Sequence, residues 1–299
     1  MKLKTAVFPV AGMGTRFLPA TKANPKEMLT IVDKPLIQYA VEEALEALRD
    51  EDDDTEIKII LVTNLYKRSI EDHFDTNYEL EARLEEAGKH ALLKEVRDIL
   101  PRGVTVAYVR QSHPAGLGHA VLCAKRLVGD EPFAILLADD LINTKGSSCL
   151  KQMADVFHQQ RNSVLAVERI DPSQTNRYGV VDIDSEGQDL GRIKAIVEKP
   201  EPKDAPSNLA VVGRYILTPA IFPLLEKTKP GKGGEIQLTD AIAALLALEK
   251  VSTLEFKGKR YDCGNKLGYL EANIVYALLH DEVGKDFQEI LKKYQGDIR

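Results

Sequence analysis

KTAVFPVAGMGTRFLPATKANPKEMLTIV, residues 4–32, combines a short apolar run, a glycine-rich bend and three basic side chains. The apolar run Ala6–Val10 is typical of a buried strand. Gly12 and Gly14 let the chain turn tightly and bring backbone N–H groups against an anion without interference from a Cβ atom. Positive charge follows at Arg16, Lys22 and Lys26. The stretch therefore predicts a phosphate-binding loop after the first strand of an α/β sheet.

This loop differs from two common nucleotide-binding motifs. It lacks the GxxxxGK[ST] pattern of the P-loop, and Phe17 stands where the dinucleotide fingerprint has its third glycine. A nicotinamide-dependent dehydrogenase is further disfavoured because Thr63 stands where an acidic ribose ligand is expected. Taken alone, a Gly-x-Gly turn fits an ordinary tight turn as well as a phosphate site, so the flanking sequence has to decide.

Composition narrows the class of protein. A length of 299 residues with 44% hydrophobic side chains allows one large α/β domain or two small ones. The net charge of −6 gives no general attraction to nucleic acid, so a polyanionic ligand needs local cations or a metal ion. Three scattered cysteines indicate a reduced compartment, and no apolar run reaches the ~20 residues of a membrane span. We expect a cytoplasmic protein that binds neither nucleic acid nor membrane.

The hydrophobic pattern predicts an α/β fold. Strand-sized apolar runs alternate with segments of helical period, which favours a largely parallel sheet with helices on both faces. A first helix is expected up to Leu48, with Asp33 as its cap and Pro35 in its first turn. A single long helix is expected over 78–100. The strand runs lie at 5–10, 57–63, 104–109, 133–138 and 163–168.

Beyond residue 170 the pattern changes to shorter strands separated by polar turns. The segments GVVDI, RIKAIVE and AVVGRYIL predict an antiparallel part that covers the ligand edge of the sheet. Helices are expected to resume at 219–227, 235–248 and 267–280, with a strand near 251–257. The acidic run at 49–56 lacks the glycine and the spaced carboxylates of a calcium loop, and we expect a solvated surface turn there.

Longer motifs resemble those of the sugar-nucleotide pyrophosphorylases, which join a nucleoside triphosphate to a sugar 1-phosphate. The first is AGMGTRFLPATKANPKEMLTIVDKPLIQYAVEEAL at 11–45, and the others extend the resemblance over almost the whole chain. They are RQSHPAGLGHAVLCA (110–124), ADD (138–140), RYGVVD (177–182), VEKP (197–200), SNLAVVGRY (207–215), GEIQLTDAI (234–242) and YDCGNKLGY (261–269).

The resemblance implies a fold and a division of the chain. The expected fold is a Rossmann-like three-layer α/β/α arrangement, with a mixed, mostly parallel sheet and a smaller antiparallel sugar-binding insertion. Residues 1–299 would form one nucleotidyltransferase domain. Within it, 1–145 would bind the nucleotide, 146–265 the sugar phosphate, and 266–299 would form C-terminal helices available for contact in a homodimer or homotetramer.

The resemblance also assigns the nucleotide site. Arg16 and Lys26 would contact the β- and γ-phosphates that leave as pyrophosphate, a role that suits a guanidinium fork and a lysine point charge. The amide of Gln111 can pair with uracil or, flipped, with cytosine, so base selection depends on what fixes its orientation. Backbone groups near Gly116 and the Glu27 side chain are the expected partners, and the resemblance places both close to the base. His119 is expected to be a structural residue of a helix start. The remaining nucleotide-binding candidates are Ala11, Gly12, Gly14, Thr15, Glu27 and Gly116.

Carboxylates and a lysine supply the rest of the expected site. Asp139 follows a buried strand and is the expected Mg²⁺ ligand, with Asp140 as the alternative and Asp262 as a second ligand by resemblance. Glu198 suits sugar hydroxyls, and Lys199 suits the sugar phosphate. By resemblance Gly179, Val212 and Gly213 also contact the sugar, and Tyr178 either packs beside it or belongs to the core.

The implied reaction is Mg²⁺-dependent attack of glucose 1-phosphate on the α-phosphate of UTP, giving UDP-glucose and pyrophosphate. Arg16, Lys26 and Lys199 are the expected catalytic cations. Two alternatives stay open. One is a thymidylyltransferase or another sugar-phosphate specificity, and the other is a catalytically weak homologue that regulates an active partner.

Overall fold

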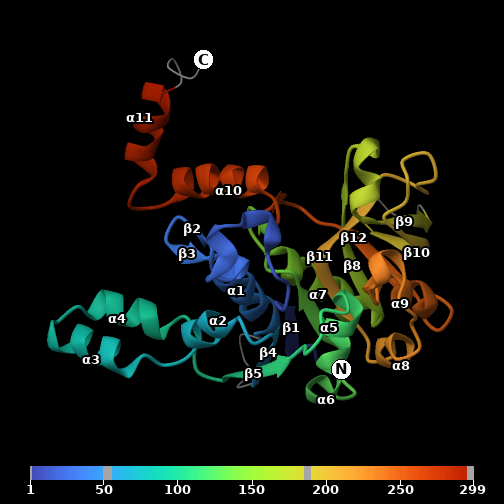
Figure 1. Cartoon of the computed structure of the whole chain (residues 1–299), viewed down its shortest axis with the longest axis horizontal. Helices are drawn as coiled ribbons and strands as arrows, with labels where there is room; N and C mark the ends of the chain where they lie inside the picture. Colours follow the sequence, from blue (N-terminus) through green and yellow to red (C-terminus); the bar gives the residue numbers. More distant parts are fainter. Residues whose placement is uncertain (1, 50–55, 185–189, 295–299) are drawn as a thin grey trace.

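A nine-stranded mixed sheet forms the centre of the fold in the computed structural model, which describes residues 2–49, 56–184 and 190–294 (Figure 1). Four neighbouring strands, β5, β4, β1 and β6, run parallel to one another. The next strand, β11, is antiparallel to both of its main neighbours, β6 and β8. β9 pairs with β11 as well as with β10, so this end of the sheet curls back on itself. In spatial order the strands are β5 (Val104–Arg110), β4 (Ile57–Thr63), β1 (Thr5–Pro9), β6 (Phe133–Leu136), β11 (Leu209–Leu217), β8 (Ser163–Arg169), β12 (Val251–Glu255), β10 (Leu190–Glu198) and β9 (Gly179–Asp184).

Helices cover both faces of the sheet. On one face α1 (Leu36–Leu48) and α7 (Cys149–Gln160) pack against inward side chains such as Phe8. On the other face Val7 packs in a second buried cluster with helices α5 (Leu117–Cys123), α6 (Lys125–Val128), α8 (Ile221–Leu225) and α9 (Leu238–Leu245). Successive residues of a strand point to opposite faces, so a strand buried on both sides must be apolar throughout. The expected three-layer α/β fold is confirmed.

The remaining elements lie around this core. Two short two-stranded sheets are formed by β2 (Thr30–Ile31) with β3 (Lys34–Pro35) and by β7 (Asp140–Asn143) with β13 (Lys259–Asp262). The helices α3 and α4 project from the body as a hairpin, and α11 stands away from it beyond α10 (Figure 1). These peripheral helices are α2 (Arg68–His73), α3 (Tyr78–Glu86), α4 (His90–Arg97), α10 (Lys266–Leu279) and α11 (Gly284–Tyr294).

The expectation of one helix over 78–100 is wrong, because the chain turns back between α3 and α4. Gly88 has a φ of 68°, in the left-handed region that glycine adopts without strain. The N–H of Lys89 donates to the carbonyl of Leu84 at 2.9 Å, which closes the end of α3 in a glycine-terminated cap.

Asp33 does not cap α1, contrary to expectation. Lys34 and Pro35 pair with the preceding strand β2, so Pro35 occupies the cap position and the helix begins at Leu36. The Asp33 carboxylate instead lies 3.1 Å from Nε2 of His280, at the far end of α10. Pro35, which the sequence pattern assigned to the first turn of the helix, therefore belongs to the β2–β3 hairpin.

The antiparallel segment after residue 170 is present, but it continues the main sheet rather than standing beside it. β11 lies in the middle of the sheet and is buried along its whole length. The helices expected at 219–227, 235–248 and 267–280 correspond to α8, α9 and α10, and the strand near 251–257 is β12. Residues 50–55 of the acidic run lie outside the described part of the chain. Within that part, no helix combines the length and apolar character needed to span a bilayer.

Candidate active site

Two adjoining cavities open where β1, β5 and β6 end. The smaller one, of about 230 Å³, is lined by residues that follow β1 and β5. The larger one, of about 470 Å³, is lined by residues that follow β6 and by the antiparallel strands. Leu117 and Glu235 line both. Ligands of open α/β sheets gather at the carboxyl ends of the strands, so this joined space is the expected place for two substrates.

The structure brings four of the predicted nucleotide-binding residues together in the smaller cavity: Ala11, Gly12, Gln111 and Gly116. Asn64 fixes the loop there, because its Nδ2 donates to the carbonyl of Ala11 at 2.6 Å.

Gly14 and Thr15 follow on the same loop, beyond the residues that line the smaller cavity. Gly14 has a φ of 65°, and a Cβ atom there would meet the Cβ of Lys26 at 3.1 Å. The positive φ and the close contact both favour glycine at this bend. Thr15 is exposed at the start of a short 3₁₀ turn.

Glu27 lines neither of the two cavities. Its side chain is 2% exposed and its carboxylate pairs with the Lys67 ammonium at 2.7 Å. Burial raises the pKa of Glu27, and the nearby Lys67 and Lys26 charges oppose that rise. The structure thus shows Glu27 in a buried ion pair that supports the loop.

Lys26 forms an ion pair with Asp139, at 2.5 Å between Nζ and Oδ2. Burial alone would lower the pKa of Lys26, but the carboxylates of Asp139 and Glu27 outweigh it and raise that pKa. Burial would likewise raise the pKa of Asp139, yet the Lys26 ammonium holds it below its ordinary value. Both groups are therefore charged at neutral pH.

Asp139, Asp262 and Arg16 converge on one small space beside Gly264. A Cβ atom at Gly264 would lie 2.9 Å from Oδ1 of Asp262, 3.0 Å from Oδ2 of Asp139 and 3.5 Å from a guanidinium nitrogen of Arg16. The backbone joins the same two loops, because Cys263 N–H donates to the carbonyl of Asp139 at 2.8 Å. The two predicted metal ligands, 123 positions apart in the chain, thus share one space.

This donor set fits a magnesium ion. Mg²⁺ usually binds one or two protein carboxylates and completes its shell with phosphate oxygens and water. Among the described residues, no group of three or more His, Cys, Asp or Glu side chains could hold a metal by itself. An ion held by Asp139 and Asp262 would therefore depend on substrate oxygens.

Asp140, the alternative metal ligand, is engaged in a structural network. Its Oδ1 accepts from Arg260 at 2.7 Å, and its Oδ2 accepts from the backbone N–H of Gly213 at 2.7 Å. Arg260 also pairs with Glu168 and lies over the ring of Tyr178, 5.2 Å from its centroid. Burial raises the pKa of Asp140, while the attraction of Arg260 opposes that rise. Both carboxylate oxygens of Asp140 are therefore already bound by protein donors.

The predicted sugar-site residues line the larger cavity together: Tyr178, Gly179, Glu198, Lys199, Val212 and Gly213. The pairing of β11 with β8 is interrupted between Val211 and Tyr215, beside the cavity. Lys199 has a φ of 47° immediately before Pro200, an unfavourable backbone conformation for a lysine. Its backbone N–H donates to the carbonyl of Tyr178 at 2.9 Å, and this hydrogen bond keeps the strained residue at the wall of the cavity.

Several side chains of the larger cavity were not predicted. Arg177 pairs with Asp262 at 3.2 Å, and Thr239 donates to Glu198 at 2.7 Å. Glu235, Gln237 and Thr239 belong to the motif GEIQLTDAI, and Arg177 begins RYGVVD. Their motifs were therefore visible in the sequence, but their roles depend on contacts between distant segments. Arg260 belongs to none of the sequence motifs quoted above.

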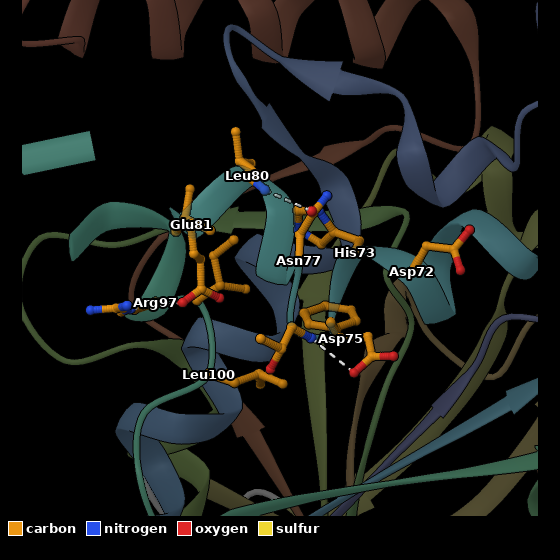
Figure 2. Close-up of a pocket in the computed structure, with 12 residues that line it drawn as sticks. Asp72, His73, Asp75, Asn77, Leu80, Glu81, Arg97 and Leu100 are labelled. Carbon is orange, nitrogen blue, oxygen red and sulfur yellow. Dashed lines mark hydrogen bonds and ion pairs between the residues drawn. The ribbon is translucent and has the colours of Figure 1, made fainter. Parts of the chain in front are cut away.

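A separate cavity of about 590 Å³ lies between α2, α3 and α4, away from all of these residues (Figure 2). Its basic residue Arg97 pairs with Glu81 at 2.7 Å, and Asn77 accepts from the N–H of Leu80 as the cap of α3. Arg97 and Asn77 thus serve the helical hairpin, and the cavity is lined by none of the predicted site residues.

The fold and the site together define a nucleotidyltransferase. The nucleotidyl transferase family matches residues 6–277, and the chain belongs to that family. The chain is 52% identical over 280 residues to a UTP–glucose-1-phosphate uridylyltransferase of Pseudomonas aeruginosa, an alignment that covers 93% of this chain and 98% of that protein. It is 48% identical to the enzyme of the same name from Bacillus subtilis, with 94% of each chain covered.

Solved structures agree with these relatives. A UDP-glucose pyrophosphorylase complexed with UDP-glucose is 47% identical, with a TM-score of 0.84 and coverage of 93% of this chain and 100% of that one. A UTP-bound UGPase from Acinetobacter baumannii is 45% identical, with a TM-score of 0.88 and coverage of 97% and 98%. The family suggested by the sequence motifs is confirmed.

Proposed function

We propose that this chain joins UTP to glucose 1-phosphate, releasing pyrophosphate and forming UDP-glucose. The observation that carries the proposal is the convergence of Arg16, Asp139 and Asp262 at the wall of the larger cavity, with Lys26 of the phosphate loop paired to Asp139. The similar enzymes named above support the choice of UTP and glucose as substrates.

The two cavities suit the two substrates. The uracil nucleoside would enter the smaller cavity, against Gly12, Gln111 and Gly116, with its triphosphate along the loop toward Arg16 and Lys26. Glucose 1-phosphate would enter the larger cavity, where Glu198 can accept from sugar hydroxyls and Lys199 can bind the phosphate. The sugar phosphate would then face the α-phosphate near Asp139.

The reaction needs no general base. A phosphate monoester with a second pKa near ~6 is largely dianionic at neutral pH, so its oxygen is already a nucleophile. That oxygen attacks the α-phosphorus in line, a P–O bond forms, and the bond to the β-phosphate breaks with pyrophosphate as the leaving group. Arg16 and Lys26 stabilise the charge that builds on pyrophosphate, and Lys199 positions the attacking phosphate.

We propose Mg²⁺ as the cofactor, held by Asp139 and Asp262. When bound, it supplies positive charge that offsets the negative charge of the phosphates. In this structure the Lys26 ammonium pairs with Asp139 at 2.5 Å, and the Arg177 guanidinium pairs with Asp262 at 3.2 Å. The Lys26 charge holds the pKa of Asp139 below its ordinary value and so keeps that carboxylate ionised, which is the form that a cation requires.

We also propose the division of the chain into a nucleotide half at 1–145, a sugar-phosphate half at 146–265 and C-terminal helices at 266–299. The β6–β7 connection, with Asp139, lies at the first boundary. Leu267, Leu270 and Ile274 of α10 are exposed by 77%, 57% and 43% on one helical face, which supports a homo-oligomer contact there. A cytoplasmic location is the setting in which these substrates and three free cysteines belong.

Pyrophosphate release with defined substrates tests the proposal. UTP and dTTP should be compared with glucose and galactose 1-phosphates in the presence of Mg²⁺. The proposal expects the UTP and glucose 1-phosphate pair to have the largest kcat/KM. A preference for dTTP would indicate a thymidylyltransferase, and no release with any pair would indicate a regulatory homologue.

A further inference from the structure

The amide of Gln111 is held in one orientation by two protein groups. Its side chain is 7% exposed at the wall of the smaller cavity, and its backbone N–H donates to the carbonyl of Thr63 at 2.8 Å. Its Nε2 lies 3.1 Å from the carbonyl oxygen of Gly116 and 3.0 Å from Nδ1 of His119. Both contacts involve the amide nitrogen.

The chemistry of these partners fixes which amide atom is which. A backbone carbonyl only accepts, so the atom facing Gly116 must be the NH₂ group. One amide hydrogen goes to Gly116, and the other goes to Nδ1 of His119, which must then be unprotonated with its proton on Nε2. The amide oxygen is the atom that Gln111 retains for a ligand.

His119 is itself held in place by the chain around it. It lies in the first turn of α5, and Gly118 N–H donates to the carbonyl of Ile236 at 2.9 Å. A Cβ atom at Gly116 would lie 2.7 Å from the Cβ of Glu235, and one at Gly118 would lie 2.8 Å from the Ile236 oxygen. This close packing leaves the start of α5, and with it the backbone that carries His119, little room to shift.

We propose that His119 is a positioning residue that sets base selectivity through Gln111. With its oxygen toward the cavity, Gln111 accepts the N3–H of uracil, whereas cytosine presents a lone pair at N3 and is repelled. His119 acts on the base only through the amide that it orients. The inference rests on the proposed use of UTP and goes beyond it by naming what rejects CTP. Thymine also carries an N3–H, so His119 does not distinguish UTP from dTTP.

Substitution of His119 tests this role. His119→Ala removes one of the two acceptors that hold the amide, so that Gly116 alone keeps the amide nitrogen away from N3 of cytosine. We expect the UTP-to-CTP ratio of kcat/KM to fall about tenfold, the size of one lost hydrogen bond. The UTP-to-dTTP ratio and the KM for glucose 1-phosphate should stay within about twofold, because neither depends on the amide orientation.

Two further variants separate positioning from general damage. His119→Asn places Oδ1 near the position of Nδ1 and should restore most of the UTP-to-CTP ratio. His113→Ala changes an exposed histidine of the same loop and should leave the ratio unchanged. An unchanged ratio in His119→Ala, or an Asn variant no better than the Ala variant, would overturn the proposal.

A measurement on the unmodified protein keeps the test independent of folding. ¹⁵N NMR of the histidine rings at neutral pH should show His119 with Nε2 protonated and Nδ1 bare. A proton on Nδ1 of the neutral ring would contradict the inferred hydrogen bond. If the unmodified enzyme forms no UDP-glucose from UTP, the proposed function itself fails; if it does so while His119→Ala retains the ratio, only the inference about His119 fails.

Discussion

The ammonium of Lys26 lies 2.5 Å from Oδ2 of Asp139 and joins the phosphate loop to the end of β6. The two side chains are 24% and 26% exposed, so water screens the pair only in part. The contact connects the glycine-rich opening of the chain to the proposed metal site. It also makes the charge of each group depend on the other.

The Lys26–Asp139 pair predicts a pH-dependent contribution to stability. The pKa of Asp139 is lower in the folded protein than in the unfolded chain, where it is about 3.9. The pair therefore stabilises the fold above that pH, and the contribution is lost as the pH falls through the lower folded value. Asp139→Asn should lower the melting temperature at pH 7, and its difference from the unmodified protein should shrink below about pH 4. A difference that stays constant from pH 7 to pH 3 would contradict the pairing.

The two adjacent aspartates should respond differently to Mg²⁺. Asp139→Asn should raise the half-saturating Mg²⁺ concentration at least about tenfold, because a metal ligand is lost. Asp140→Asn should leave that concentration within about twofold and instead lower the melting temperature, because it weakens the contact with Arg260. Activity titrated with Mg²⁺ measures both variants. The opposite pattern would assign the metal to Asp140.

The buried pair of Glu27 and Lys67 should show strong coupling. Lys67→Met leaves the Glu27 carboxylate without its partner at 2% exposure, which we expect to cost about 3–5 kcal/mol of unfolding free energy. The double variant Glu27→Gln with Lys67→Met removes both charges and should recover most of that loss. Denaturant unfolding of the two singles and the double gives the coupling energy. A double variant as unstable as Lys67→Met would show that packing, not charge, matters there.

The exposed face of α10 should govern self-association. Leu270→Lys places a charge in the apolar stripe and should shift the protein toward a smaller species in sedimentation velocity. Lys266→Glu, at the start of the same helix, serves as the control and should leave the sedimentation coefficient unchanged. Identical coefficients for Leu270→Lys and the unmodified protein would remove this face from the proposed contact.

Sequence patterns predicted the fold well where strands are buried on both faces. All five early strands follow their apolar runs. For β1, β4, β6 and β8 the reason is burial, because a strand covered by helices has no polar side to interrupt the run, whereas β5 is a partly exposed edge strand. Local patterns failed where a strand pairing or a single glycine decided the course of the chain. Asp33 resembles a helix cap, but the residues after it, Lys34 and Pro35, pair in the β2–β3 hairpin. Gly88 adopts a positive φ and ends α3, although the apolar period of the sequence continues past it.

The same distinction holds at the site. Asp139 and Gln111 could be placed because each follows a strand at the ligand edge. Asp140 could not be separated from Asp139 by sequence, because its role depends on Arg260, 120 residues away across the β7–β13 pair. Glu27 could be assigned to the nucleotide site only by resemblance, and its ion pair with Lys67, 40 residues further along the chain, had no signal in the sequence.

The stoichiometry of the products formed from UTP and glucose 1-phosphate with Mg²⁺ distinguishes in-line transfer from its alternatives. The proposed mechanism predicts equal amounts of UDP-glucose and pyrophosphate, and their reconversion when pyrophosphate is added in excess. Lys199→Ala should lower kcat/KM for glucose 1-phosphate about a hundredfold, since it removes a charged contact to the sugar phosphate. Pyrophosphate formed without UDP-glucose, or a uridylylated side chain that accumulates before product, would contradict the in-line transfer proposed for this site.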